Sequence, residues 1–85
     1  MFKDYTTSTY KSQLLIAFYL DTEVTNIKYE KGEKVLSFKM SYESCEKLNE
    51  LFKTNMQLES HEIEIAKEIR KKLIADYYNK KVGGN

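Results

Sequence analysis

Gly32 is the only glycine that precedes the last three residues of this 85-residue chain, and it stands between two segments of alternating polarity. Apolar side chains recur at every second position in Val24–Glu30 and in Val35–Met40, which is the period of a β-strand with one buried face. Glycine adopts the positive φ angles of a two-residue hairpin turn without steric cost. The pattern therefore predicts an antiparallel hairpin whose turn is Lys31-Gly32.

A two-residue turn also determines which residues face each other across this hairpin. It places Ile27 opposite Leu36 and Thr25 opposite Phe38. The apolar faces of the two strands then coincide. This match fixes the register, because a shift by one residue would turn every side chain to the other face.

The segment before the hairpin, Tyr10–Leu20, also alternates in polarity. Leu14, Ile16 and Phe18 fall on one face of an extended chain, so the pattern favours a strand. A helix is the alternative, because leucine, alanine and glutamine favour helices and the Thr- and Ser-rich residues 7–9 could cap one. We predict a strand.

Two helices are predicted after the hairpin. Apolar residues recur at helical spacing in Tyr42–Lys53 and again in Ser60–Lys80, which is typical of helices with one buried face. Ser41 is the expected N-cap of the first helix, and Ser60 is the expected N-cap of the second. Residues 53–58 break the pattern and are predicted to form a loop.

Together these elements predict an α+β fold, with a three-stranded antiparallel meander followed by two helices in a two-layer single domain. The domain is expected to cover residues 10–82, after a loosely ordered segment at 1–9 and before a frayed tail at 83–85. The helices are expected to cover the sheet face that carries Leu14, Ile16, Phe18, Ile27, Leu36 and Phe38.

The chain has few of the residues on which enzyme sites are built. It has one histidine, His61, and one cysteine, Cys45, so it can form no histidine pair, thiolate metal cluster or intramolecular disulfide. His61 is expected to be exposed in the first turn of the last helix, and Cys45 to be a small buried apolar residue. We predict a non-enzymatic protein with no catalytic residue, metal or other cofactor.

Charge and hydropathy indicate the compartment. Fourteen basic and thirteen acidic residues leave a formal net charge of +1, which creates no strong global field. The longest apolar run, Leu14–Leu20, is shorter than the roughly 20 residues that span a bilayer. A single cysteine suits a reducing compartment. We therefore expect a cytoplasmic protein without a membrane partner.

The first candidate binding surface is the sheet face turned away from the helices. If Tyr10–Leu20 is a strand, apolar residues gather on that face among polar ones, which is typical of a contact surface. This face predicts a protein partner or a homodimer. Its residues are Leu15, Ala17, Tyr19, Val24 and Val35.

The second candidate surface is the basic half of the last helix, where six basic and two acidic residues lie between positions 67 and 81. Basic side chains could contact phosphates, and tyrosines could stack on bases. Basic residues near a helix C-terminus also suit the helix dipole, so the same pattern fits a solvated helix end. The residues of this nucleic-acid alternative are Lys67, Arg70, Lys71, Lys72, Tyr77, Tyr78, Lys80 and Lys81.

The seven tyrosines of the chain are too many for one small core, and exposed tyrosines are typical of protein interfaces. We predict a small protein-binding module, acting as an inhibitor, adaptor or regulatory subunit through an apolar, tyrosine-rich surface. A nucleic-acid-binding regulator is the alternative. In its size and lack of motifs the chain resembles small phage- or mobile-element-encoded inhibitors such as anti-CRISPR proteins, and this resemblance implies a viral inhibitor of host defence.

Overall fold

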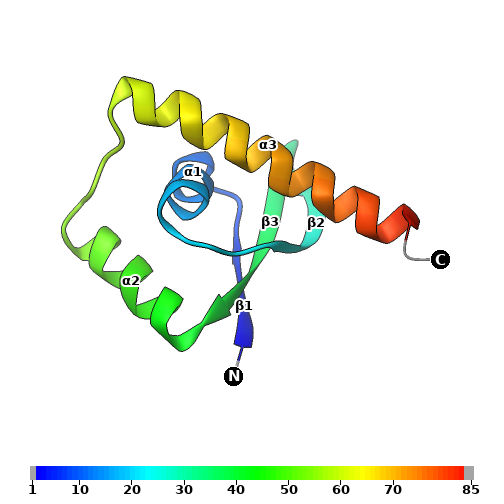
Figure 1. The fold of residues 1–85 in the computed structure, drawn as a ribbon, viewed down its shortest axis with the longest axis horizontal. Coiled ribbons are helices and arrows are strands. Elements are labelled where there is room, and N and C mark those ends of the chain that lie inside the picture. The colour runs from blue at the N-terminus through cyan, green and yellow to red at the C-terminus, as the bar shows by residue number, and fades with distance from the viewer. Residues whose placement is uncertain (1, 84–85) are drawn as a thin grey trace.

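The structure is a computed structural model that describes residues 2–83. These residues form three strands in one antiparallel sheet of order β1-β3-β2, together with three helices (Figure 1). The α+β class with three antiparallel strands is confirmed. The elements are β1 (Phe2–Thr7), α1 (Tyr10–Tyr19), β2 (Val24–Glu30), β3 (Glu33–Ser41), α2 (Tyr42–Lys53) and α3 (Ser60–Gly83).

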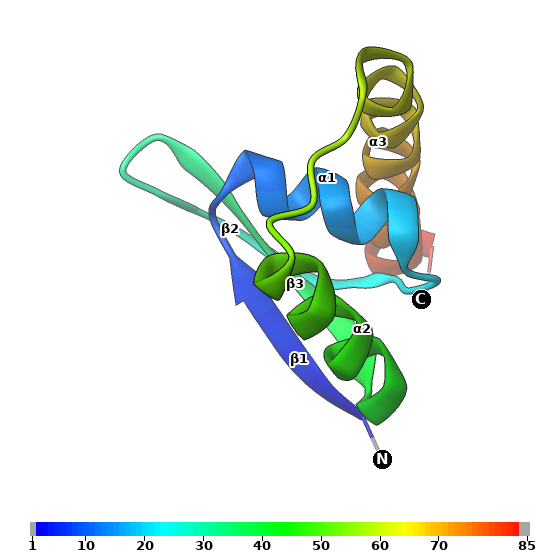
Figure 2. The same ribbon diagram turned by 90° about the vertical axis from the view of Figure 1, so that its left-hand side faces the viewer.

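The core lies between one face of the sheet and the helices, which stand on the same side of it (Figure 2). From the sheet, β3 contributes Leu36, Phe38 and Met40, which are all fully buried. These positions alternate along the strand, so they share one face. The buried residues that complete the cluster are Ile16 of α1, Leu20 directly after α1, Val24 of β2, and Leu48 and Leu51 of α2.

The strand predicted for Tyr10–Leu20 is wrong, because residues 10–19 form the helix α1. Five consecutive residues of this helix, from Gln13 to Ala17, are buried. The helix packs against α3 and also contributes to the core over the sheet. A helix buried on several sides has no polar face, so its apolar run carries no helical period and resembles a buried strand.

The segment expected to be loosely ordered contains the strand β1. It pairs with β3 from Phe2 opposite Ser41 to Thr7 opposite Leu36, so β3 is the central strand. Because α1 follows β1 in the chain and β1 lies next to β3, the connectivity is not the predicted meander. Residues 84–85 of the predicted frayed tail lie outside the described residues, and Gly83 is the last residue of α3.

The predicted hairpin is confirmed, with β2 and β3 joined at Lys31 and Gly32. Both residues have positive φ angles, 51° and 79°, as a primed two-residue turn requires. Ile27 faces Leu36 as expected. The predicted pairing of Thr25 with Phe38 is wrong. Val24 faces Phe38 instead, because an irregularity between Val24 and Asn26 adds one residue to β2, as a β-bulge does.

The helix α2 has the predicted bounds and the predicted cap. The Ser41 hydroxyl accepts a hydrogen bond from the backbone N–H of Ser44 at 3.1 Å, which satisfies one donor of the first turn.

The helix α3 begins at Ser60, but the cap is one residue earlier. The carbonyl of Glu59 accepts the first helical bond, from the N–H of Ile63 at 2.8 Å. The Glu62 carboxylate accepts from the N–H of Glu59 at 2.9 Å, which is one half of a capping box. The helix continues past the predicted end at Lys80. Within residues 2–83, no helix combines the length and the apolar composition that a membrane crossing requires.

Candidate functional site

Arg70 is the only arginine of the chain, and α3 holds it half-buried against α1. Its Nε–H donates a hydrogen bond of 2.8 Å to the side-chain oxygen of Gln13. Its guanidinium carbon lies 4.8 Å from the centre of the Tyr10 ring, within the range of a cation–π interaction. Two residues of α1 therefore fix the orientation of Arg70.

Gln13 is itself held in place, because it is only 1% exposed and its amide is fully engaged. The Nε2 group donates to the backbone carbonyl of Thr7 at 3.0 Å and to that of Lys34 at 2.9 Å. The side-chain oxygen is left to accept from Arg70. One buried amide thus joins β1, β3 and α3 at the position of Arg70.

The charge of Arg70 has no counter-ion in the part of the chain that the structure describes. No carboxylate of residues 2–83 forms an ion pair with it, and its terminal amino groups donate no hydrogen bond to these residues. Burial lowers the pKa of Arg70, an effect that Tyr10 and Tyr29 oppose. An arginine still keeps its charge at neutral pH, so Arg70 is a half-buried cation without a counter-ion among residues 2–83.

Three exposed tyrosines lie on this part of the molecule. Tyr10 contacts the Arg70 cation, Tyr29 acts electrostatically on it, and Tyr78 is a neighbour of Tyr29. Tyr29 of β2 is 64% exposed, Tyr10 is 48% exposed and Tyr78 of α3 is 42% exposed. The Lys34 ammonium lies 5.7 Å from the centre of the Tyr29 ring. Burial, and then the neighbouring Tyr29, raise the pKa of Tyr78. Tyr10, Tyr29, Lys34, Arg70 and Tyr78 are named here the tyrosine–arginine surface.

Two open hollows adjoin this surface, and Tyr10, Lys34 and Arg70 border both. One lies over the start of α1 and the hairpin, and the other lies along α3. The charged residues that line them comprise four basic side chains and three acidic ones. These are Lys34, Lys67, Arg70 and Lys71, and Glu33, Glu64 and Glu68.

A third hollow on the other side of Tyr10 is mainly apolar and has a volume of about 400 Å³. It lies between α1, the loop before α3, and the first turns of α3. We call it the apolar groove. Its lining residues are Tyr10, Lys11, Leu14, Leu15, Gln57, Leu58 and Ile63.

The apolar face predicted as a protein contact does not exist as an exposed surface. Leu15, Ala17, Val24 and Val35 are 2–6% exposed, and Tyr19 is half-buried and packed against the core. The prediction failed because it depended on a strand at residues 10–20. Leu15, Ala17 and Tyr19 lie on the helix α1, whereas Val24 and Val35 lie on β2 and β3. Among the five, Leu15 and Val24 each line a surface hollow.

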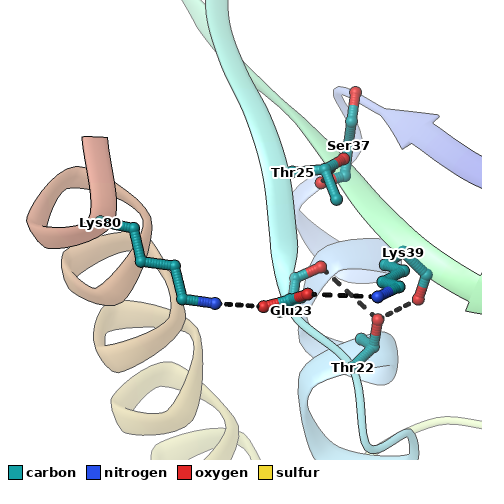
Figure 3. Close-up of polar contacts among 6 residues, drawn as sticks. All are labelled: Thr22, Glu23, Thr25, Ser37, Lys39 and Lys80. Atoms are coloured by element: carbon teal, nitrogen blue, oxygen red, sulfur yellow. Dashed lines mark hydrogen bonds and ion pairs between the residues drawn. The ribbon is translucent and has the colours of Figure 1, made fainter. Parts of the chain in front are cut away.

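The basic residues predicted for nucleic acid do not form a continuous free stripe. Lys67 pairs with Glu64 at 3.2 Å and Lys71 with Glu68 at 3.8 Å. Lys80 reaches Glu23, which also pairs with Lys39 at 3.7 Å. Figure 3 shows Glu23 between the lysine of α3 and the lysine of β3.

The remaining predicted residues of this helix are divided between core and solvent. Tyr77 is half-buried and packs against the core, and its hydroxyl donates to the Asn26 side chain at 3.5 Å. The Lys81 ammonium lies 5.8 Å from the centre of the Tyr77 ring. Lys72 is exposed. Of the two tyrosines predicted to stack on bases, only Tyr78 is therefore exposed.

The single histidine and the single cysteine of the chain lie apart from the tyrosine–arginine surface. His61 is exposed, with its ring 3.7 Å from the Glu59 carboxylate. Cys45 is half-buried and packs against the core. In residues 2–83 no group of three or more His, Cys, Asp or Glu side chains is arranged to hold a metal ion.

Comparison with known proteins gave no match, whether with family models, curated proteins or solved structures. The geometry described above is therefore the basis for the functional proposal. The sequence analysis selected Arg70 and Tyr78 but missed Tyr10, Gln13, Tyr29 and Lys34. Two features of the sequence could have pointed to the contact between Arg70 and Gln13. The chain has a single arginine, and a glutamine directly precedes its longest apolar run.

Proposed function

We propose that this chain is a small, non-enzymatic cytoplasmic module that binds another protein as an inhibitor, adaptor or regulatory subunit. The contact is made by the tyrosine–arginine surface. The observation that carries the proposal is a row of neighbours from α1, β2 and α3. The only arginine of the chain interacts with the exposed Tyr10 and Tyr29, and Tyr29 in turn neighbours the exposed Tyr78. Tyrosine and arginine are the residues that most often dominate the energy of protein interfaces.

The apolar groove supports the same assignment. It shares Tyr10 with the tyrosine–arginine surface, so an apolar hollow and a polar aromatic patch are continuous. An interface with an apolar part beside polar aromatic anchors has the composition of protein–protein contacts. Phe52 and Met56, at 40% and 38% exposure, lie on the segment that leads into this groove.

The ion pairs along α3 argue against the nucleic-acid alternative. Lys67, Lys71 and Lys80 each pair with a glutamate of the same chain. Phosphate binding depends on basic side chains that can replace the counter-ions of nucleic acid, and adjacent carboxylates oppose it. Lysines paired in this way suit a protein partner better.

The test is a pull-down from a nuclease-treated lysate of the source organism, washed at low and at high salt. The wild-type chain is compared with the double variant Tyr29→Ala/Tyr78→Ala. Tyr42→Ala is the matched control, since Tyr42 is 75% exposed on α2, away from this surface. We expect one protein to be retained in a fixed ratio at high salt by the wild type and the control, and to be lost by the double variant.

Other results would overturn the proposal in identifiable ways. Material that disappears with nuclease or salt would transfer the function to nucleic acid. Equal retention by the double variant would show that the surface is wrong. A population of dimers that grows with protein concentration, and that is smaller for the double variant, would assign the surface to a homodimer.

A further inference from the structure

We infer that the partner presents an aspartate or glutamate side chain to Arg70, and that this carboxylate is the specificity contact of the interface. The inference rests on the proposed function, because it specifies the chemistry of the protein partner. Among the described residues, Arg70 is a cation that is held in a fixed orientation, is half-buried and has no counter-ion.

The geometry of Arg70 suits a carboxylate. Its Nε–H is engaged by Gln13, while its terminal amino groups donate to no acceptor in residues 2–83. A planar guanidinium forms two parallel hydrogen bonds with a carboxylate, which gives both strength and direction. Gln13 is buried and fixed by two backbone carbonyls, so the guanidinium is held before the partner arrives. Holding it in advance reduces the entropy cost of binding.

Tyr10 strengthens such a contact. Its ring lies against the guanidinium, and a ring in this position excludes water from one face. A charge-assisted hydrogen bond gains strength where water is excluded. The half-buried position of Arg70 has the same effect, because a partner completes the burial of a charge that then needs a counter-ion.

The local charge indicates a carboxylate rather than a phosphate. The two hollows next to Arg70 are lined by four basic and three acidic side chains, so one positive charge is left uncompensated. An aspartate or glutamate brings one negative charge and neutralises it. A phosphate group brings about two at neutral pH, and Glu33, Glu64 and Glu68 would repel the excess.

The experiment is selection of binders from a random peptide library on the immobilised wild-type chain. The dominant peptide is then remade with each aspartate or glutamate changed to its amide, and with phosphoserine in its place. Binding is measured to the wild type, Arg70→Ala, Arg70→Lys and the control Lys72→Ala, which removes one charge from an exposed position of the same helix.

We expect one acidic residue in the peptide whose amide version binds about tenfold more weakly to the wild type, which corresponds to loss of a charge-assisted hydrogen bond. The same change should have no effect on binding to Arg70→Ala. Arg70→Lys should retain part of the affinity, because lysine keeps the charge but not the two parallel bonds. Lys72→Ala should bind as the wild type does.

Failure of this inference is distinct from failure of the proposed function. Peptides without an acidic requirement that bind wild type and Arg70→Ala equally would overturn the carboxylate contact and leave a protein-binding surface. Tighter binding of the phosphoserine version would assign the site to phosphate. The absence of any selected peptide, with no partner in the pull-down, would remove both. The amide versions test the contact on the folded wild type, so the result stands even if Arg70→Ala is unstable.

Discussion

Two of the polar contacts that tie α3 to the rest of the fold differ in almost every respect except their span. The Arg70–Gln13 bond and the Lys80–Glu23 bond each join residues 57 positions apart. The first is formed around a buried, neutral amide and leaves its cation without a counter-ion. The second is an exposed ion pair that Lys39 extends across to β3, as Figure 3 shows.

From this difference we expect the stronger structural contact to be the one built on a buried amide, and not the one with more charges. Exposed ion pairs contribute little to stability, because water and salt screen them. A buried amide has no water to replace a lost partner, so each of its hydrogen bonds is expensive to remove. We therefore expect the Arg70–Gln13 contact to contribute more to stability than the Lys80–Glu23 ion pair, whose main effect is to neutralise charge on α3.

The largest effect is expected for Gln13→Ala. It leaves the carbonyls of Thr7 and Lys34 without their donor and creates a cavity, so the free energy of unfolding should fall by about 3 kcal/mol. Urea denaturation followed by circular dichroism measures it. The control is Gln57→Ala, in an exposed loop, which should stay within about 0.5 kcal/mol of the wild type. Equal effects of the two variants would show that burial of the amide does not matter.

Arg70→Ala is expected to have the next largest effect. It leaves the buried side-chain oxygen of Gln13 without a donor, and the free energy of unfolding should fall by about 1.5 kcal/mol. Arg70→Lys should lose less if the ammonium reaches the same oxygen. The measurement is again urea denaturation. An Arg70→Ala variant more stable than the wild type would mean that relief of the uncompensated charge outweighs the lost hydrogen bond.

The comparison itself can be tested with two double-mutant cycles at low salt. The cycle of Gln13→Ala with Arg70→Ala should give a coupling free energy of about 1 kcal/mol, as expected for contacting residues in one network. The cycle of Glu23→Gln with Lys80→Ala should give a smaller coupling that decreases further when salt is added. If the second coupling exceeded the first, the ranking proposed above would be reversed.

The smallest expected effect is a pH dependence of the stability that the Lys80–Glu23 ion pair contributes. The hydrogen bond and the charge of Lys80 lower the pKa of Glu23 from its ordinary value of 4.5. The folded state then binds protons less readily than the unfolded state, so the stabilisation is present above pH 4.5 and lost as the pH falls through the lowered pKa. The denaturation midpoint of the wild type should exceed that of Glu23→Gln at about pH 6, and the difference should vanish near about pH 2. A difference that grows on acidification would contradict the assignment.

Local patterns predicted the elements that have one buried face. The turn at Lys31-Gly32, the cap at Ser41 and the spacing of α2 follow from short-range rules and are confirmed. The helix α1 was mistaken for a strand because burial of Gln13 through Ala17 removes the polar face that reveals a helix. The strand β1 has a mostly polar sequence and is stabilised by its pairing with β3, which no local pattern indicates.

The candidate site was also predictable only in part, because it depends on contacts between residues far apart in the sequence. The composition of α3 pointed to Arg70 and Tyr78, and the number of tyrosines pointed to an interface. The contact between Arg70 and Gln13 depends on how α3 crosses α1, and no spacing rule connects residues so far apart. The expected contact face at Leu15 and Val35 failed with the strand on which it depended.

The buried amide of Gln13 has a consequence for how the protein is made. During synthesis α1 leaves the ribosome long before Arg70, which follows 57 residues later. Until α3 arrives, the glutamine oxygen lacks its arginine donor and α1 lacks the helix that covers it. We therefore expect α1 and the sheet to fold stably only after α3 has left the ribosome.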